Sequence, residues 1–256
     1  MSLEVRHCKG KLWGFATVFS SMLMFIVGGH MSSIFDIIGP VMIGPSSSHS
    51  AGAAKLALMA KYIFGFHIDR ADITLYGSFA KTYKGHGTDK ALVGGLLGMN
   101  ADDERIRVSF ARASEAGLKY NFIESQEEPE HPNTVMFDLY DTEGHHKSIV
   151  GRSLGGGRIE IVRINGLEVE ITGDESTILT FHKDRPGIVA KVTKMISDLD
   201  VNISSMRVFR KQRYADAVML IHTDSSVDKD TLSEMEKVNG VTSVMYFEPL
   251  SKVVAP

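Results

Sequence analysis

Residues 177–199 read TILTFHKDRPGIVAKVTKMISDL, in which a strand pattern is followed by a proline–glycine turn and an amphipathic helix. The predicted strand covers 177–182 and the turn covers 184–187. The predicted helix has an apolar face made of Ile188, Val192, Met195, Ile196 and Leu199. Further strands are predicted at 201–210, 217–222 and 241–247, with a second helix at 227–238 that Gly240 closes. This β-α-β-β-α-β order predicts a ferredoxin-like fold.

The region before this unit has a different mixture of elements. A helix rich in small residues is predicted at 51–64, a short strand at 73–76 and a second helix from Thr88. Strand patterns at 135–139 and 148–150 follow, and then a hairpin at 159–171 in which Asn165-Gly166 predicts a type I′ turn. Because polar residues fill 172–176, we predict an α+β chain with domains at 31–173 and 174–250.

The first thirty residues differ from both domains. Arg6, Lys9 and Lys11 precede an uncharged, largely apolar stretch at 12–29, as in a signal segment or membrane anchor. Serines and glycines interrupt that stretch, it has no clear cleavage site, and a well-patterned domain begins at Met31. We expect 1–30 to be an extension produced by a mistaken upstream start, with a true anchor as the alternative. The expected location is the cytoplasm, without membrane attachment.

Composition excludes several functions. The chain has 256 residues and a formal net charge of −3, which argues against a nucleic-acid partner. Its single cysteine, Cys8, excludes an internal disulfide. One thiolate also excludes an iron–sulfur cluster held by this chain alone, and we predict no metal ligands in it.

The strongest local motif is Gly44-Pro45-Ser46-Ser47-Ser48-His49-Ser50, directly before the helix at 51–64. Hydroxyls, an imidazole and free N–H groups of a helix N-terminus can converge there on an anion, and a carboxylate is the natural ligand. The candidate binding residues are Ser46, Ser47, Ser48 and His49. The alternative is a helix cap with additional serines.

Two further motifs carry histidines. Gly77-Ser78-Phe79-Ala80-Lys81-Thr82 is followed by Gly85-His86-Gly87-Thr88-Asp89, where flanking glycines leave His86 accessible and the next helix N-terminus favours a neutral ring. His86 is therefore a candidate base, or else a surface residue of a flexible loop. His131-Pro132-Asn133-Thr134 lies at the mouth of a predicted strand, with Pro132 fixing an extended entry. Gly155-Gly156-Gly157 lacks the lysine and helix of a phosphate loop and predicts a turn.

Taken together and in this order, these motifs resemble the beta subunit of iron–sulfur L-serine dehydratases, from Met31 to about Phe247. Asp184-Arg185-Pro186-Gly187, with Val201-Asn202-Ile203, resembles the signature of an ACT domain. The N-terminal domain is also similar to the allosteric substrate-binding domain of some phosphoglycerate dehydrogenases, which is α+β. One departure is Ser50, where the family commonly has threonine, and the hydroxyl is kept.

The resemblance implies deamination of L-serine to pyruvate and ammonia, a reaction of serine catabolism that can feed gluconeogenesis. It implies a 4Fe-4S cluster ligated by a partner alpha subunit, where an open iron acts as Lewis acid on the substrate hydroxyl. By analogy, Ser46, Ser47, Ser48 and His49 would hold the substrate carboxylate, and His131 and Asn133 would complete the polar wall. His86 would remove the Cα proton or orient the group that does.

For the C-terminal domain the resemblance implies homodimerisation. Gly187 and Asn202 from neighbouring copies would bind L-serine or another small amino acid, unless the domain serves dimerisation alone. The alternative to an enzyme half-site is a stand-alone amino-acid-binding regulator that shares the fold without a catalytic role.

Overall fold

The structure is a computed structural model that describes residues 26–27, 30–31 and 41–251. Near the N-terminus, β1 (Ile26–Val27) and β2 (His30–Met31) form a short antiparallel pair. The rest of the predicted 1–30 extension lies outside the described residues. Within the described ranges, no helix has both the length and the apolar character needed to cross a bilayer.

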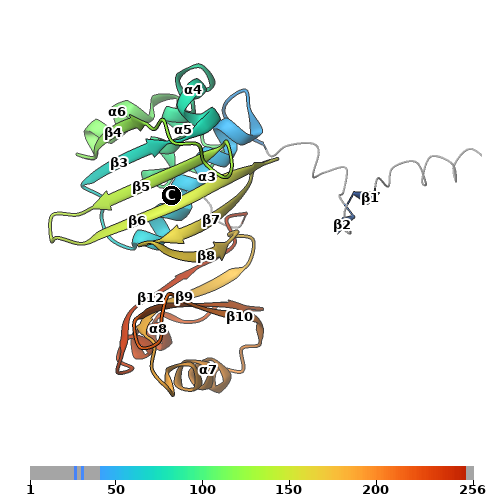
Figure 1. Cartoon of the computed structure of the whole chain (residues 1–256), viewed down its shortest axis with the longest axis vertical. Coiled ribbons are helices and arrows are strands. Elements are labelled where there is room, and N and C mark those ends of the chain that lie inside the picture. The colour runs from blue at the N-terminus through green and yellow to red at the C-terminus, as the bar shows by residue number, and fades with distance from the viewer. Residues whose placement is uncertain (1–25, 28–29, 32–40, 252–256) are drawn as a thin grey trace, which may run out of the picture. The chain divides into compact units, whose positions relative to one another are not determined.

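The first half of the remaining chain is built on a six-stranded sheet of order β4-β3-β5-β6-β7-β8 (Figure 1). β3 and β4 are parallel and the other pairs are antiparallel. The strands are β3 (Arg70–Leu75), β4 (Lys119–Glu124), β5 (Thr134–Tyr140), β6 (His146–Gly155), β7 (Arg158–Ile164) and β8 (Leu167–Ile171). The helical segments are a π-helical turn η1 (Ser47–Ala51), α3 (Gly52–Phe64), α4 (Gly77–His86), α5 (Thr88–Leu96), a 3₁₀ turn η2 (Glu104–Val108) and α6 (Ser109–Glu115).

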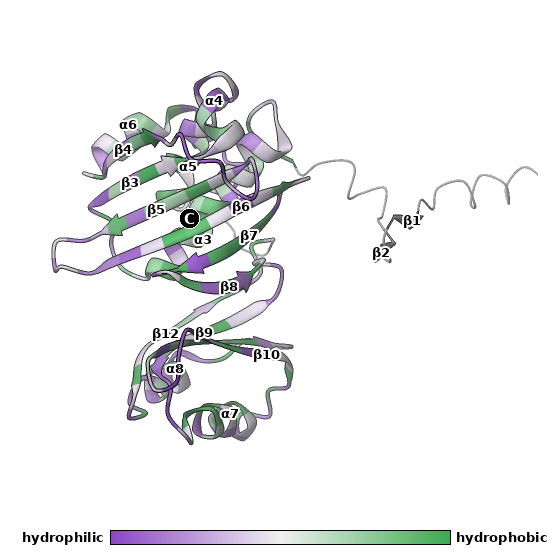
Figure 2. Ribbon diagram, in the orientation of Figure 1, coloured by the Kyte–Doolittle hydropathy of each residue, from purple (hydrophilic) through white to green (hydrophobic). Residues whose placement is uncertain are grey.

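The core of this domain lies between the sheet and α3, which runs behind the strands in Figure 1. The predicted alternation in β5 is confirmed, because Val135, Phe137 and Leu139 are fully buried and the residues between them are partly exposed. Hydrophobic and hydrophilic residues accordingly follow one another along the strands (Figure 2). α3 is buried on most of its surface, which explains why its sequence is apolar and small rather than amphipathic.

The turn predictions are confirmed, and one loop prediction is wrong. Asn165 and Gly166 have φ values of 49° and 71°, as a type I′ turn requires. Gly155-Gly156-Gly157 turns the chain from β6 into β7. His86, however, does not lie in a flexible loop, since it is the last residue of α4. That helix begins where the Pro132 carbonyl accepts the Ser78 N–H, and it ends at the left-handed Gly87.

The second half has the predicted ferredoxin-like fold, a four-stranded antiparallel sheet of order β10-β11-β9-β12. Its elements are β9 (Ser176–Lys183), α7 (Ile188–Asp198), β10 (Ile203–Arg210), β11 (Asp216–Thr223), α8 (Lys229–Glu236) and β12 (Val241–Phe247). Ile188, Val192 and Ile196 of α7 are buried against the sheet, as predicted. Leu199 lies beyond the last helical residue and is 38% exposed. The predicted domain division at 173/174 falls in the connection from β8 to β9 and stays a prediction.

A buried lysine joins the end of α3 to the second sheet. Lys147 lies on the inward-facing side of β6, where its ammonium donates to the carbonyls of Ile63 and Phe64 at 2.8 and 3.1 Å. Those carbonyls belong to the C-terminus of α3, where cations are favoured. The same ammonium lies 4.8 Å from the ring centroid of Phe181 in β9. Burial lowers the pKa of Lys147 to about 8.

This shift predicts how stability depends on pH. Because Lys147 loses its proton more easily in the folded state, the unfolded state binds more protons between pH 8 and 10.5, and stability should rise there. Relative to Lys147→Met, the wild-type chain should gain about 2 kcal/mol of unfolding free energy between pH 7 and 10. Urea unfolding of both proteins across this range measures the difference. A difference that stays flat with pH would show that Lys147 titrates normally.

Candidate functional site

The serine-rich motif forms the first turn of the long helix that continues as α3. Ser46 is the N-cap, with extended backbone angles, and its Oγ accepts the N–H of His49 at 3.1 Å. Gly44 permits a close approach, because a Cβ there would lie 2.3 Å from the Ser50 Oγ and its φ is +123°. The capping function considered from sequence is therefore present. One serine fulfils it, and Ser47 and Ser48 are not needed for the cap.

His49 lies at the centre of a hydroxyl-rich cluster. Its Nδ1 is 3.1 Å from the Ser48 Oγ, and its Nε2 is 3.0 Å from the Ser78 Oγ on α4. The ring of Phe79 packs edge-on against it at 5.2 Å, and the ring of His86 lies 4.9 Å away. Burial lowers the pKa of His49, His86 lowers it further, and hydrogen bonding with the backbone of Ser78 raises it in part. The surroundings therefore favour a neutral imidazole.

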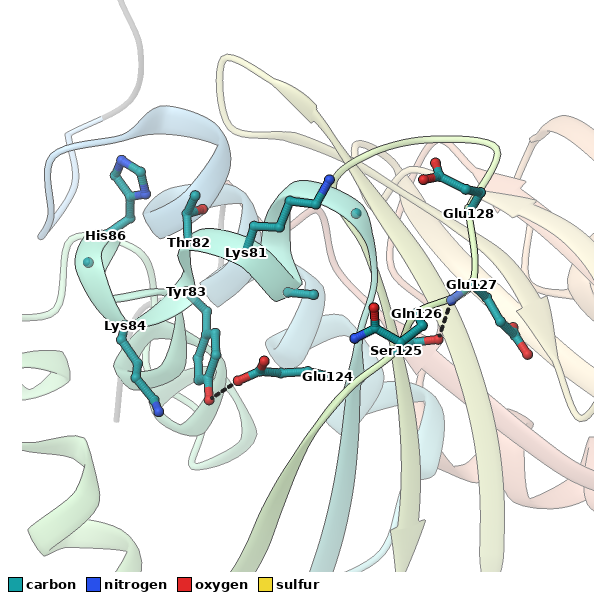
Figure 3. A pocket seen from close by; sticks show the side chains of 13 residues that line it. Lys81, Thr82, Tyr83, Lys84, His86, Glu124, Ser125, Gln126, Glu127 and Glu128 are labelled. Atoms are coloured by element: carbon teal, nitrogen blue, oxygen red, sulfur yellow. Dashed lines mark hydrogen bonds between the residues drawn. The ribbon is translucent and has the colours of Figure 1, made fainter.

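The backbone of His86 is held by a hydrogen bond, while its side chain lines two cavities. Its carbonyl accepts the Ser50 hydroxyl at 3.1 Å. Its Nδ1 is buried and has no hydrogen-bond partner among the described residues. The side chain lines a cavity of about 640 Å³. Figure 3 shows it at one end, beside Thr82, with Glu127 and Glu128 at the other end. His86 also lines a second cavity of about 350 Å³, together with Gly44 and Pro45.

The loop at 131–133 contacts the N-terminus of α4 directly and the start of α3 through Ser153. The Pro132 carbonyl accepts the N–H of Ser78 at 2.7 Å, beside the hydroxyl that contacts His49. The Asn133 carbonyl accepts the N–H of Ser153 at 2.9 Å. The Ser153 Oγ in turn faces Gly52 at the start of α3, where a Cβ would lie 2.0 Å away. Asn133 is thus placed next to the cluster around His49.

His131 has a separate position. Its Nδ1 accepts the Asn133 N–H at 3.2 Å, and its side chain lines a different cavity of about 200 Å³ with Tyr76 and Arg152. Burial lowers the pKa of His131, Arg152 lowers it further, and Glu160 raises it. The structure therefore brings Ser46–His49, His86 and Asn133 into one neighbourhood, and places His131 beside it.

Several buried polar atoms in this neighbourhood have no partner within the described part of the chain. They are the His86 Nδ1, Thr88 Oγ1, Asn133 Oδ1 and Ser153 Oγ. Buried polar atoms in folded proteins are nearly always hydrogen-bonded. Unpaired polar atoms at the start of α3 and at the junction of α4 and α5 indicate a place where a ligand, water or another chain supplies the missing groups.

Sequence reasoning missed three serines of this cluster. Ser78 binds His49, Ser50 binds the His86 carbonyl, and Ser153 approaches Gly52. Ser78 had a weak signal, a hydroxyl directly after Gly77 at the start of the Gly77–Thr82 motif. Ser50 and Ser153 act through long-range contacts that local sequence does not encode.

The side chains do not fit as ligands of an iron–sulfur cluster. Such a cluster typically takes three or four thiolates, and Cys8 is the chain's single cysteine. Among the described residues, one group of potential metal ligands occurs, Asp141, Glu143 and His145 in the turn between β5 and β6, and it contains no sulfur. The cluster of hydroxyls and imidazoles suits an organic anion better than iron.

Comparison with known proteins places this chain in a class. Residues 33–118 match the family described as serine dehydratase beta chain, and residues 176–240 match the ACT domain. The two matches define an ACT-containing protein of the serine dehydratase beta type, as the motifs had indicated.

The full-length relatives identify the family. The chain is 42% identical to the probable L-serine dehydratase, beta chain, of Bacillus subtilis (strain 168), over 83% of this chain and 96% of the relative. It is 37% identical to the L-serine dehydratase, beta chain, of Peptoniphilus asaccharolyticus, over 84% and 98%. The chain belongs to the L-serine dehydratase beta chain family. It is also 28% identical to a D-3-phosphoglycerate dehydrogenase of Synechocystis sp., over 74% of this chain and 34% of the relative, which confirms the predicted relationship.

Proposed function

We propose that this chain is the beta subunit of an L-serine dehydratase and supplies binding and proton-transfer groups for the deamination of L-serine to pyruvate and ammonia. The observation that carries the proposal is the pairing of His49 and His86, 4.9 Å apart, at a helix N-terminus surrounded by unpaired polar atoms. A helix N-terminus with free N–H groups favours a carboxylate. A neighbouring imidazole can accept a proton from the adjacent carbon.

The substrate carboxylate is held at the first turn before α3, by the hydroxyls of Ser46, Ser47 and Ser48 and the N–H groups that begin this helix. Both ring nitrogens of His49 already have hydroxyl partners. His49 therefore contributes by fixing Ser48 and Ser78, and contacts the carboxylate directly when Ser48 turns away. Asn133 offers its unpaired Oδ1 to the substrate ammonium, and His131 closes the wall from the neighbouring cavity.

His86 takes the proton from Cα. Loss of the β-hydroxyl as water then gives aminoacrylate, which tautomerises to an imine and hydrolyses to pyruvate and ammonia. When bound on the alpha subunit, a 4Fe-4S cluster would supply Lewis acidity for the departure of the hydroxyl group. The work of this chain is to hold the carboxylate, to orient Cα toward His86 and to accept its proton. We place the assembled enzyme in the cytoplasm.

We propose that the C-terminal domain serves dimerisation or binds an amino-acid effector. Gly187 has a φ of +90° with open space where a side chain would lie, so a ligand can approach the backbone there. Asn202 Nδ2 donates to the Asp224 carboxylate at 2.6 Å, which holds the amide at the start of β10. A ligand that bridges Gly187 and Asn202 would use two copies of this domain.

Anaerobic reconstitution tests the main proposal. The isolated chain should not deaminate serine, and the chain assembled with a cluster-loaded alpha subunit should. His49→Ala should lower turnover by roughly one to two orders of magnitude, because it removes the group that organises two hydroxyls. Ser233→Ala is the control, since this hydroxyl donates to a carbonyl within α8. Serine turnover by the metal-free isolated chain would exclude a half-site. Amino-acid binding without activity in any assembly would favour the stand-alone regulator.

A further inference from the structure

We infer that Ser78 is a positioning residue that sets the orientation of the His49 ring toward His86. The inference deepens the proposed function and rests on it where catalysis is concerned. Ser78 Oγ lies 3.0 Å from His49 Nε2, although 29 residues separate them in the chain. This contact joins the serine-rich turn to α4, the helix that ends at His86.

The backbone of Ser78 is held on both sides. Its N–H donates to the Pro132 carbonyl at 2.7 Å, and its carbonyl accepts the Thr82 hydroxyl at 2.8 Å. The preceding Gly77 has a φ of +53°, and a Cβ there would lie 2.7 Å from the Pro132 carbonyl oxygen. A residue with a side chain would therefore force this turn apart. The Ser78 hydroxyl consequently has a defined position relative to the loop at 131–133.

The opposite side of the His49 ring is held by the serine-rich turn itself. Ser48 Oγ lies 3.1 Å from Nδ1, and Ser46 Oγ lies 3.5 Å from it. A neutral imidazole has one N–H donor and one acceptor nitrogen, and a serine hydroxyl can serve either one. The His49 ring is thus held between the Ser48 hydroxyl, in the turn before α3, and the Ser78 hydroxyl, in α4. Without Ser78, Nε2 loses this partner and the ring is free to turn about its Cβ–Cγ bond.

Ring rotation matters because of what lies beside the ring. His49 and His86 are 4.9 Å apart with an interplanar angle of 45°, and Phe79 packs on the edge of His49. Turning His49 would change its packing against His86 and release Ser48, which borders the proposed carboxylate site. The expected consequence is a less favourable reacting geometry, with substrate still bound.

The first test reads the His49 ring directly and needs no activity. The full chain is labelled with ¹⁵N-histidine, and the His49 signals are assigned by their loss in His49→Asn. The Nε2 resonance should shift in Ser78→Ala and return toward its wild-type position in Ser78→Thr, which restores a hydroxyl. Unchanged His49 resonances in Ser78→Ala would overturn the inference.

The second test uses the enzyme assembled with its alpha subunit. Ser78→Ala should lower kcat about tenfold, the effect expected from one hydrogen bond, with a smaller change in KM. Ser78→Thr should recover most of that loss. Ser109→Ala is the matched control, because it removes a buried hydroxyl that donates to the Lys90 carbonyl in the same domain. It should keep the wild-type kcat per folded molecule.

The two tests separate the inference from the proposed function. If Ser78→Ala shifts the His49 resonances but keeps the wild-type kcat, Ser78 orients the ring, and the catalytic part of the inference is wrong. If the assembled wild-type enzyme does not deaminate serine, the proposed function fails, and the ¹⁵N spectra still decide whether Ser78 orients His49.

Discussion

Replacing His86 with asparagine is expected to lower kcat for serine deamination by roughly two to four orders of magnitude in the assembled enzyme. The reason is that His86 is placed to accept the Cα proton and asparagine cannot. Its ring reaches two cavities, and its Nδ1 has no partner among the described residues, so the base is not already engaged within the chain. Substrate affinity should be largely kept, because the proposed carboxylate contacts come from the turn before α3.

The measurement is steady-state and single-turnover kinetics of the assembled enzyme, with His145→Asn as the control. His145 is an exposed histidine in the turn between β5 and β6, stacked on Phe66 and bound to Asp141, so its loss should leave kcat unchanged. A solvent-exchange assay of the Cα proton should show the same large loss for His86→Asn. Near-normal kcat in that variant would show that another residue of the assembled enzyme is the base.

The elements predicted from sequence are those with strong local periodicity. The hairpin around Asn165-Gly166 has its turn signal, and the helix that begins at Thr88 has its start signal, within the element itself. The ferredoxin-like unit also has strong local signals, namely strands of alternating polarity and an apolar stripe on α7. α4 lacks these signals. Its first N–H groups are satisfied by Pro132, more than fifty residues further along the chain, so no local reading could find its start.

The candidate site could be predicted as segments but not as an arrangement. The serine-rich turn and His86 were found because their residue types and flanking glycines are unusual. The proximity of His49 and His86 depends on how α4 packs near the start of α3, and sequence spacing does not determine that packing. Ser78 was overlooked for the same reason, since its importance comes from the 3.0 Å contact with His49. His131 shows that neighbours in a motif can separate in space, because its side chain lines a different cavity, and its role stays a prediction.

The packing of α5 on α3 gives the second large prediction, which concerns stability. A Cβ at Gly95 would lie 2.3 Å from the Ala54 carbonyl oxygen and 2.6 Å from the Ala57 Cβ. Both atoms belong to the rigid backbone region of α3, so Gly95→Ala must push the two helices apart. Because neither contact can yield alone, overpacking here should cost about 3 kcal/mol, the upper end of its usual range, and alanine's better helix propensity offsets about 1 kcal/mol. We expect a net loss of about 2 kcal/mol in unfolding free energy.

Gly94→Ala is the matched control, one residue away on the same helix. Its added Cβ would meet the Ile106 Cγ1 at 3.0 Å, a side-chain atom in a short 3₁₀ turn that can shift by a few tenths of an ångström. The gain in helix propensity should then leave this variant within about 1 kcal/mol of wild type. Urea unfolding followed by circular dichroism compares the three proteins, provided that the m-values agree. Equal stability of the two variants would mean that the helices separate at little cost, and that the close approach at Gly95 is not what holds α3 and its serine-rich first turn in place.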